Sequence, residues 1–130
     1  MANELTLSAS ISGAFNNVTV SKALSNVIKS IAASVKLVQQ AIQNIGNSEE
    51  AIDMGTLSTP GWALFINLDQ TNSIDLKVAT GGAIFARLDP DSAGDGTGGF
   101  ALLKLGSGAT APYAVTTSGT CDMYYLIFEA

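Results

Sequence analysis

The sequence contains no histidine and only one cysteine, Cys121. Histidine is the usual general base near neutral pH, the commonest protein ligand of metals and the partner of most activated serine or cysteine nucleophiles, so most hydrolytic templates are excluded. A single cysteine excludes an intrachain disulfide and a cysteine-based metal cluster, and we interpret Cys121 as a small buried hydrophobe. We therefore expect no catalytic residue set, no metal site and no cofactor.

Charge is also scarce, because only 13% of the residues are charged and the six Lys and Arg residues are spread singly. Without a basic patch, and with a net charge of −5, nucleic-acid binding is not expected. No run of 18 apolar residues occurs, and the first residues do not read as a secretory signal, so we expect no membrane-spanning segment and no N-terminal export signal.

The apolar content is high, since 47% of the 130 residues are hydrophobic. A chain of this size can bury a sizeable core, and we expect one compact domain over residues 1–130. A free monomer usually carries more solubilising charge than this chain does. The composition therefore favours a protein whose surface is partly covered by other subunits.

Short stretches of alternating apolar and polar residues dominate the chain. Residues 4–11 alternate in this way, and we expect that strand to end at Ser12 and Gly13. Turn-forming clusters of Gly, Asp, Asn and Ser separate the other expected strands, which are 61–68, 73–78, 82–88, 100–105, 111–117 and 121–130. The sequence predicts an all-β protein, specifically a compact antiparallel β-sandwich that is jelly-roll-like.

Residues 21–45 fit two structures. Seven aliphatic residues recur at spacings of four and three, with Gly46 where a helix would end, and this pattern predicts a helix. Six of the seven are β-branched, however, which favours strands. We favour two strands, at about 27–37 and 38–45, and keep the helix as the alternative; the seven residues are Leu24, Ile28, Ile31, Val35, Val38, Ile42 and Ile45.

Glu49 and Glu50 are adjacent carboxylates, and a pair of carboxylates is what a glycosidase requires. Adjacent residues on a strand point to opposite faces, so these two are poorly placed to act together. Asn47 and Ser48 can accept backbone N–H groups, and Glu50 follows Asn47 at the spacing of a capping box. We predict a strand-joining turn or a single helical turn here.

The segment 89–99 gathers Asp89, Asp91 and Asp95 among small residues. Oxygen-rich loops of this kind can bind Ca²⁺, but the spacing of an EF-hand fails because Ala93 and Phe100 fall at ligand positions. We predict a solvated, flexible loop at the most exposed tip of the molecule.

Four segments resemble those of small virion proteins of tailed bacteriophages: IGNSEEAIDMG (45–55), FINLDQTNSIDL (65–76), APYAV (111–115) and CDMYYLIFEA (121–130). In that family an IG-T/S-EEA-L segment leads to an NLDATN turn, and the chain closes with a Tyr-Leu-Ile strand and an acidic residue. The resemblance covers most of residues 38–130 and the opening ELTLSAS. It departs from the family in the longer loop 89–99 and in segment 21–45. It implies a compact β-sandwich with a structural role.

The resemblance and the composition together predict a non-enzymatic capsid decoration, or cement, protein on the exterior of the phage head, made in the host cytoplasm. Its partner would be the major capsid protein or another virion protein, and a homo-oligomer is expected, with a trimer favoured. The alternatives are a neck or tail component of the virion, and a carbohydrate-binding or host-adhesion module that uses Trp62 and the Tyr residues. No contact with nucleic acid or membrane is expected.

Strands 4–11 and 121–129 are the candidate docking edges of such a protein. Within and near them we expect interface residues that are apolar or aromatic, since such anchors dominate protein interfaces. The candidates are Leu5, Leu7, Trp62, Tyr124, Tyr125 and Phe128. A salt bridge from Glu49 or Glu50 to a neighbouring subunit is a further hypothesis.

Overall fold

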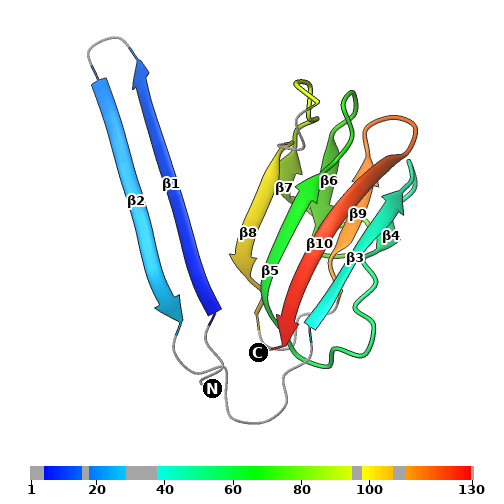
Figure 1. Cartoon of the computed structure of the whole chain (residues 1–130). Helices are drawn as coiled ribbons and strands as arrows, with labels where there is room; N and C mark the ends of the chain where they lie inside the picture. The colour runs from blue at the N-terminus through cyan, green and yellow to red at the C-terminus, as the bar shows by residue number, and fades with distance from the viewer. Residues whose placement is uncertain (1–4, 16–17, 29–37, 95–97, 107–110, 130) are drawn as a thin grey trace. The chain divides into compact units, whose positions relative to one another are not determined.

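The computed structural model describes residues 5–15, 18–28, 38–94, 98–106 and 111–129, and these form strands, turns and loops without a helix (Figure 1). The chain divides into two compact units, residues 1–36 and 37–130, which are described separately. The prediction of a single domain over residues 1–130 stays a prediction.

The first unit contains a two-stranded antiparallel sheet of β1 (Leu5–Phe15) and β2 (Val18–Ile28). The predicted end of the first strand at Ser12 and Gly13 is wrong, because both residues pair with β2 and the ladder continues to Phe15. The helix alternative is also wrong for 21–28, which lies in β2. The favoured strand at about 27–37 is placed too late in the chain, because β2 begins at Val18; residues 29–37 lie outside the described residues.

The second unit is an antiparallel β-sandwich, which confirms the predicted all-β fold. Four strands form the first sheet, in the spatial order β3 (Val38–Ile45), β10 (Cys121–Glu129), β5 (Pro60–Asn67) and β8 (Phe100–Lys104). The second sheet has the order β4 (Glu50–Ala51), β9 (Tyr113–Thr116), β6 (Ile74–Lys77) and β7 (Ile84–Leu88). The described residues of 38–45 are a strand, as favoured from the β-branched pattern.

The connectivity is that of a jelly roll. The second half of this unit runs back along the first, so that β6 pairs with β7, β5 with β8, β4 with β9 and β3 with β10. The doubled chain then wraps round, which brings β10 beside β5 and β9 beside β6. This folding of one long doubled ribbon into two sheets is the double Greek key of jelly rolls.

The core lies between the two sheets and follows the period-two alternation of the strands. On β5 the inward residues Ala63, Phe65 and Asn67 are buried, while the residues between them are half-buried. Further core residues come from β3 and β10 of the first sheet and from β6, β7 and β9 of the second. They are Ile45, Ile74, Leu76, Leu88, Ala114, Cys121, Met123, Tyr125 and Ile127.

Two local predictions differ in detail from the structure. The turn predicted around Glu49 is confirmed, because residues 46–49 join β3 to β4, but Glu50 begins a short strand and no helical turn forms. The Glu50 carboxylate accepts the N–H of Gly46 at 2.6 Å and so braces this turn. The strand predicted from residue 111 begins at Tyr113, since Pro112 has no N–H to donate to the ladder.

Candidate functional site

The outer side of the first sheet carries apolar residues on all four of its strands, mixed on β3 with the polar Gln40 and Asn44. A sheet with one face on the core normally presents polar residues on the other face, whereas here aliphatic and aromatic residues alternate with the buried ones. We call this surface the outer apolar face. Its apolar residues are Val38, Ile42, Trp62, Leu64, Ile66, Phe100, Leu102, Tyr124, Leu126 and Phe128, and its polar residues are Gln40, Asn44, Asp122 and Lys104.

The register of the ladder arranges these residues in rows that cross the sheet. One row contains Ile42, Tyr124, Ile66 and Phe100, and the next contains Gln40, Leu126, Leu64 and Leu102. In a third row Val38 pairs with Phe128, and Trp62 pairs with Lys104. Side chains opposite each other in neighbouring strands are close enough to pack, so the rows form one continuous surface.

The largest exposed side chains lie on the two lateral strands of the face. Val38 and Ile42 on β3 are 50% and 60% exposed, and Phe100 on β8 is 66% exposed. Among the described residues of the face, charge occurs only near the strand ends, at Asp122 and Lys104. Asp122 accepts a hydrogen bond from the side-chain amide of Asn44 at 2.8 Å. The face is thus mostly apolar, with charged residues near its ends and Gln40 in the middle of the β3 edge.

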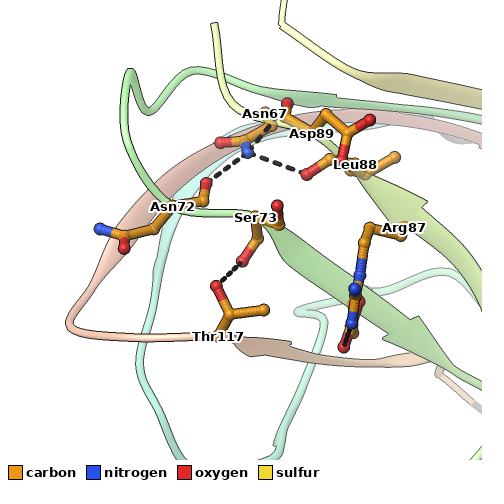
Figure 2. Close-up of polar contacts among 8 residues, drawn as sticks. Asn67, Asn72, Ser73, Arg87, Leu88, Asp89 and Thr117 are labelled. Atoms are coloured by element: carbon orange, nitrogen blue, oxygen red, sulfur yellow. Dashed lines mark hydrogen bonds and ion pairs between the residues drawn. The ribbon is translucent and has the colours of Figure 1, made fainter. Parts of the chain in front are cut away.

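The outer side of the second sheet is different, because it carries ion pairs. Arg87 on β7 donates from Nε and Nη2 to the two carboxylate oxygens of Asp75 on β6, at 2.6 and 2.8 Å, and Figure 2 shows the Arg87 side chain. The hydrogen bond from Arg87 lowers the pKa of Asp75 and raises that of the guanidinium. Asp75 is only 7% exposed, and the bidentate pair satisfies its carboxylate at this surface. The second sheet and the turn after β6 also expose the apolar residues Val78, Ile84 and Phe85, so the two sheets differ mainly in the ion pairs that the second one carries.

Glu49 forms its ion pair within the chain, with Lys77, and also accepts the N–H of Gly81 at 2.5 Å. The contact with Lys77, followed by that with Gly81, lowers the pKa of Glu49. A salt bridge from Glu49 to another subunit would therefore have to replace its ion pair with Lys77.

The predicted interface residues fall in different places. Trp62, Tyr124 and Phe128 all belong to the outer apolar face and are half-buried. Tyr125 is 1% exposed and packs in the core, where its hydroxyl donates to the carbonyl of Asp53 at 2.7 Å. Leu5 and Leu7 lie on β1 of the first unit. An interface role for the six residues stays a prediction, but a contact through the Tyr125 ring would require the sandwich to open.

The docking edge predicted at 121–129 is wrong, because β10 lies between β3 and β5 and its backbone is paired on both sides. The edge strands of this sheet are β3 and β8. Sequence reasoning also missed Ile42, Leu64 and Phe100 as surface residues. The available signal was apolar residues at consecutive positions in WALFI (62–66), which includes Leu64, and in YYLIF (124–128), which indicate strands apolar on both faces.

A second polar cluster lies at one end of the sandwich and has a structural role. Asn67 is completely buried, and its side-chain amide donates to the carbonyls of Asn72, Leu88 and Asp89 at 2.8, 3.1 and 3.2 Å (Figure 2). Its side-chain oxygen accepts the N–H of Asp69 at 2.9 Å. One asparagine thereby joins the end of β5 to the turn after it and to the end of β7.

The next residues complete this turn. The Asp69 carboxylate accepts the N–H groups of Thr71 and Asn72 at 2.8 and 2.7 Å, which is an Asx-type turn. These backbone bonds, first that of Asn72 and then that of Thr71, lower the pKa of Asp69. The segment NLDQTN is therefore explained by hydrogen bonding within the fold.

The pKa shifts of Asp69 and Asp75 predict a loss of stability in acid. Each carboxyl has a lower pKa in the folded chain than its ordinary 3.8, so each stabilises the fold above that pH, and the contribution is lost as pH falls through the folded-state value. We expect the melting temperature to fall as the pH is lowered from 4 towards 2. The Asp75→Asn variant should show a shallower fall in a thermal melt series, and an unchanged acid slope would contradict this assignment.

The loop 89–99 is anchored at its base, while Ser92, Ala93 and Gly94 are exposed as predicted; its flexibility and its place as the most exposed tip stay predictions. Asp91 is only 5% exposed, its N–H donates to the carbonyl of Asp69 at 2.6 Å, and the N–H of Gly99 donates to the carbonyl of Asp89 at 2.8 Å. Gly98 and Gly99 are needed here because a Cβ on either would collide with backbone atoms of Asn67 or Asp89. Asp95 lies outside the described residues, and the described part of the chain contains no group of three or more residues able to hold a metal ion.

Cys121 is 1% exposed, which confirms that it is buried. Desolvation, reinforced by the charges of Asp69 and Asp122, raises its pKa to about 11. Because the thiolate is the reactive form, we expect a chromogenic disulfide reagent at pH 8 to titrate no thiol in the native protein and one per chain in denaturant. Rapid titration of the native protein would contradict this burial.

Comparison of the chain with protein-family models, with curated proteins and with solved structures finds no match. The described residues contain no helix that is long and apolar enough to cross a membrane.

Proposed function

We propose that this chain is a non-enzymatic structural protein of a tailed-bacteriophage virion, located on the capsid exterior as a decoration protein. The outer apolar face is the observation that carries the proposal. A contiguous apolar surface across four strands is of the kind that proteins bury against other proteins. The resemblance of residues 45–55, 65–76 and 121–130 to small phage virion proteins supports the virion as the setting.

The two units of the chain are suited to different contacts. The sandwich supplies a broad face for association between subunits, and β1 and β2 supply a long two-stranded sheet. An isolated two-stranded sheet is marginally stable in water, so this unit gains most from pairing or packing with a partner. We assign attachment to the major capsid protein, or to another virion protein, to this first unit. Repetition over many copies would make the binding additive.

The test is the abundance of the chain in purified virus particles, measured by quantitative mass spectrometry relative to the major capsid protein. We expect a ratio near one, as for a protein that covers the capsid lattice. A ratio of a few per cent would favour a neck or tail component instead. Absence from the particle would overturn the assignment to the virion.

Attachment through the first unit has its own test. Removing residues 1–11 deletes most of β1 and leaves β2 without its partner in the ladder. We expect the truncated protein to lose occupancy on particles by a large factor while a full-length control binds. Equal occupancy of the two would contradict an anchoring role for this unit.

A carbohydrate-binding or host-adhesion module is the second candidate function. The supporting observation is that Trp62, Tyr124, Phe128 and Phe100 all lie on the same outer face, and aromatic rings can stack on sugars. A glycan array probed with the purified protein separates the two functions. Binding that is lost on Trp62→Ala and Tyr124→Ala substitution would favour the adhesion module, and silence on the array would favour the structural role.

A further inference from the structure

The outer apolar face presents large hydrophobic side chains at its lateral margins. Interfaces are normally apolar at the centre and polar at the rim. Here the lateral strands carry Val38, Ile42 and Phe100, the most exposed hydrophobic residues of the face, whereas Asp122 and Lys104 lie towards its ends. On β3 these side chains alternate with the polar Gln40 and Asn44, so that margin is mixed, but both margins still expose large apolar side chains that a neighbour could cover.

We infer that three copies of the chain turn their outer apolar faces towards one threefold axis that runs parallel to the strands of β3, β10, β5 and β8. In this arrangement the β3 edge of each copy meets the β8 edge of the next, and the ring closes. The inference deepens the proposed function by naming the first partner of the face, and it rests on the same surface.

The width of the sheet favours three copies over four. Strands lie about 4.8 Å apart, so this sheet of four strands is about 19 Å wide. Three such faces around an axis each lie roughly 5.5 Å from it, close to half of the ~10 Å at which sheets pack face to face. Four faces would each lie about 9.5 Å from the axis and leave a void at the centre, which is unfavourable in a packed interface.

The register brings matching residues to the same height. Rotation about an axis parallel to the strands keeps each row level, so the row Ile42, Tyr124, Ile66 and Phe100 continues from copy to copy. Phe100 of one copy then lies beside Ile42 of the next. The contact is head-to-tail and closes by rotation, as in other cyclic oligomers.

Electrostatics allow copies to associate through this face although the chain has a net charge of −5. The described residues of the face carry one acid, Asp122, and one base, Lys104, whose charges cancel. The ion pairs lie on the outer side of the other sheet, which faces away from the axis. The acidic charge of the assembly is therefore directed towards solvent, where water screens it.

The first experiment measures the mass of the purified full chain by native mass spectrometry and sedimentation. We expect about 40 kDa, three times the 13.3 kDa of one chain. Ile42→Glu and Phe100→Glu should each reduce the mass to that of a single chain, with the β-sheet circular dichroism retained. Ile84→Glu is the matched control, because Ile84 is 48% exposed but lies on β7 of the other sheet, and it should leave the trimer intact.

A second experiment uses cross-linking and does not depend on the folding of the charged variants. Oxidation of the double variant Ile42→Cys with Phe100→Cys should give a covalent trimer on a non-reducing gel. Each single variant should give none, because the contact is head-to-tail and Cys121 is buried. Monomers, or a dimer of about twice the chain mass, would overturn the threefold arrangement.

A trimer that survived both glutamate substitutions would overturn the assignment of its contacts to this face. None of these outcomes changes the abundance of the chain in virus particles. Failure of the trimer and failure of the virion assignment are therefore distinguishable.

Discussion

Replacing Asn67 with alanine is expected to lower the free energy of unfolding by about 3–5 kcal/mol. The substitution removes the donors to the carbonyls of Asn72, Leu88 and Asp89, and the acceptor for the N–H of Asp69. Each buried backbone group left without a partner costs about 1–3 kcal/mol. Urea denaturation followed by circular dichroism gives the difference directly.

Asn72→Ala is the matched control for this measurement. The Asn72 side chain donates only to the exposed hydroxyl of Thr71, while its backbone carbonyl, which accepts from Asn67, is kept. We expect a loss below about 1 kcal/mol, the usual value of an exposed hydrogen bond. Asn67→Asp, which keeps the shape and removes the amide donors, should resemble Asn67→Ala. If Asn67→Ala were as mild as the control, the carbonyls would have other partners and the structural role of Asn67 would be refuted.

Phe65→Ala is expected to cost about 3–5 kcal/mol, because a completely buried ring is removed from the core and a cavity remains. The loss should be the same at every protein concentration. Leu64 is its neighbour on β5 but belongs to the outer apolar face. Leu64→Ala should therefore cost most at high concentration, where copies cover the face, and little at high dilution.

Thermal melts over a hundredfold range of protein concentration separate the two effects. The melting temperature of the wild type should rise with protein concentration. That of Leu64→Ala should rise less over the same range, because fewer of its chains are in the oligomer. A wild-type melting temperature independent of concentration, with Leu64→Ala as costly as Phe65→Ala, would show that Leu64 acts within one chain. That result would remove the energetic argument for a covered face.

Sequence reasoning identified most strands of the second unit because period-two alternation is a local property of the chain, but it did not place β2, which begins at Val18. It could not assign partners, since β10 lies between two strands that are far from it in sequence. Tyr124 and Tyr125 illustrate the limit. Adjacent residues on a strand point to opposite faces of the sheet, so Tyr124 and Tyr125 cannot both lie on the outer face. The sequence alone does not indicate which of the two points outward. The register of β10 with β3 and β5 decides this, and it buries Tyr125.

Asn67 shows the same limit for a polar residue. It lies in the segment NLDQTN, whose composition is typical of a turn. Nothing nearby in sequence indicates that Asn67 is completely buried. Its burial depends on the end of β7, which the wrapping of the jelly roll brings to the end of β5. The two-residue strand β4 escaped prediction for a related reason, because only its pairing with β9 defines it.

The central position of β10 also sets the order in which the molecule can form. During synthesis β3 and β5 emerge early, but the strand that separates them comes last among the described strands. Until it inserts, both neighbours have unpaired backbone groups and lack their inner packing partners. We therefore expect folding of this sheet to wait until β10 has emerged from the ribosome, and to be slow, as pairing between distant strands usually is. Subunit association would follow that step, because the rows of the outer apolar face do not exist before β10 is in place.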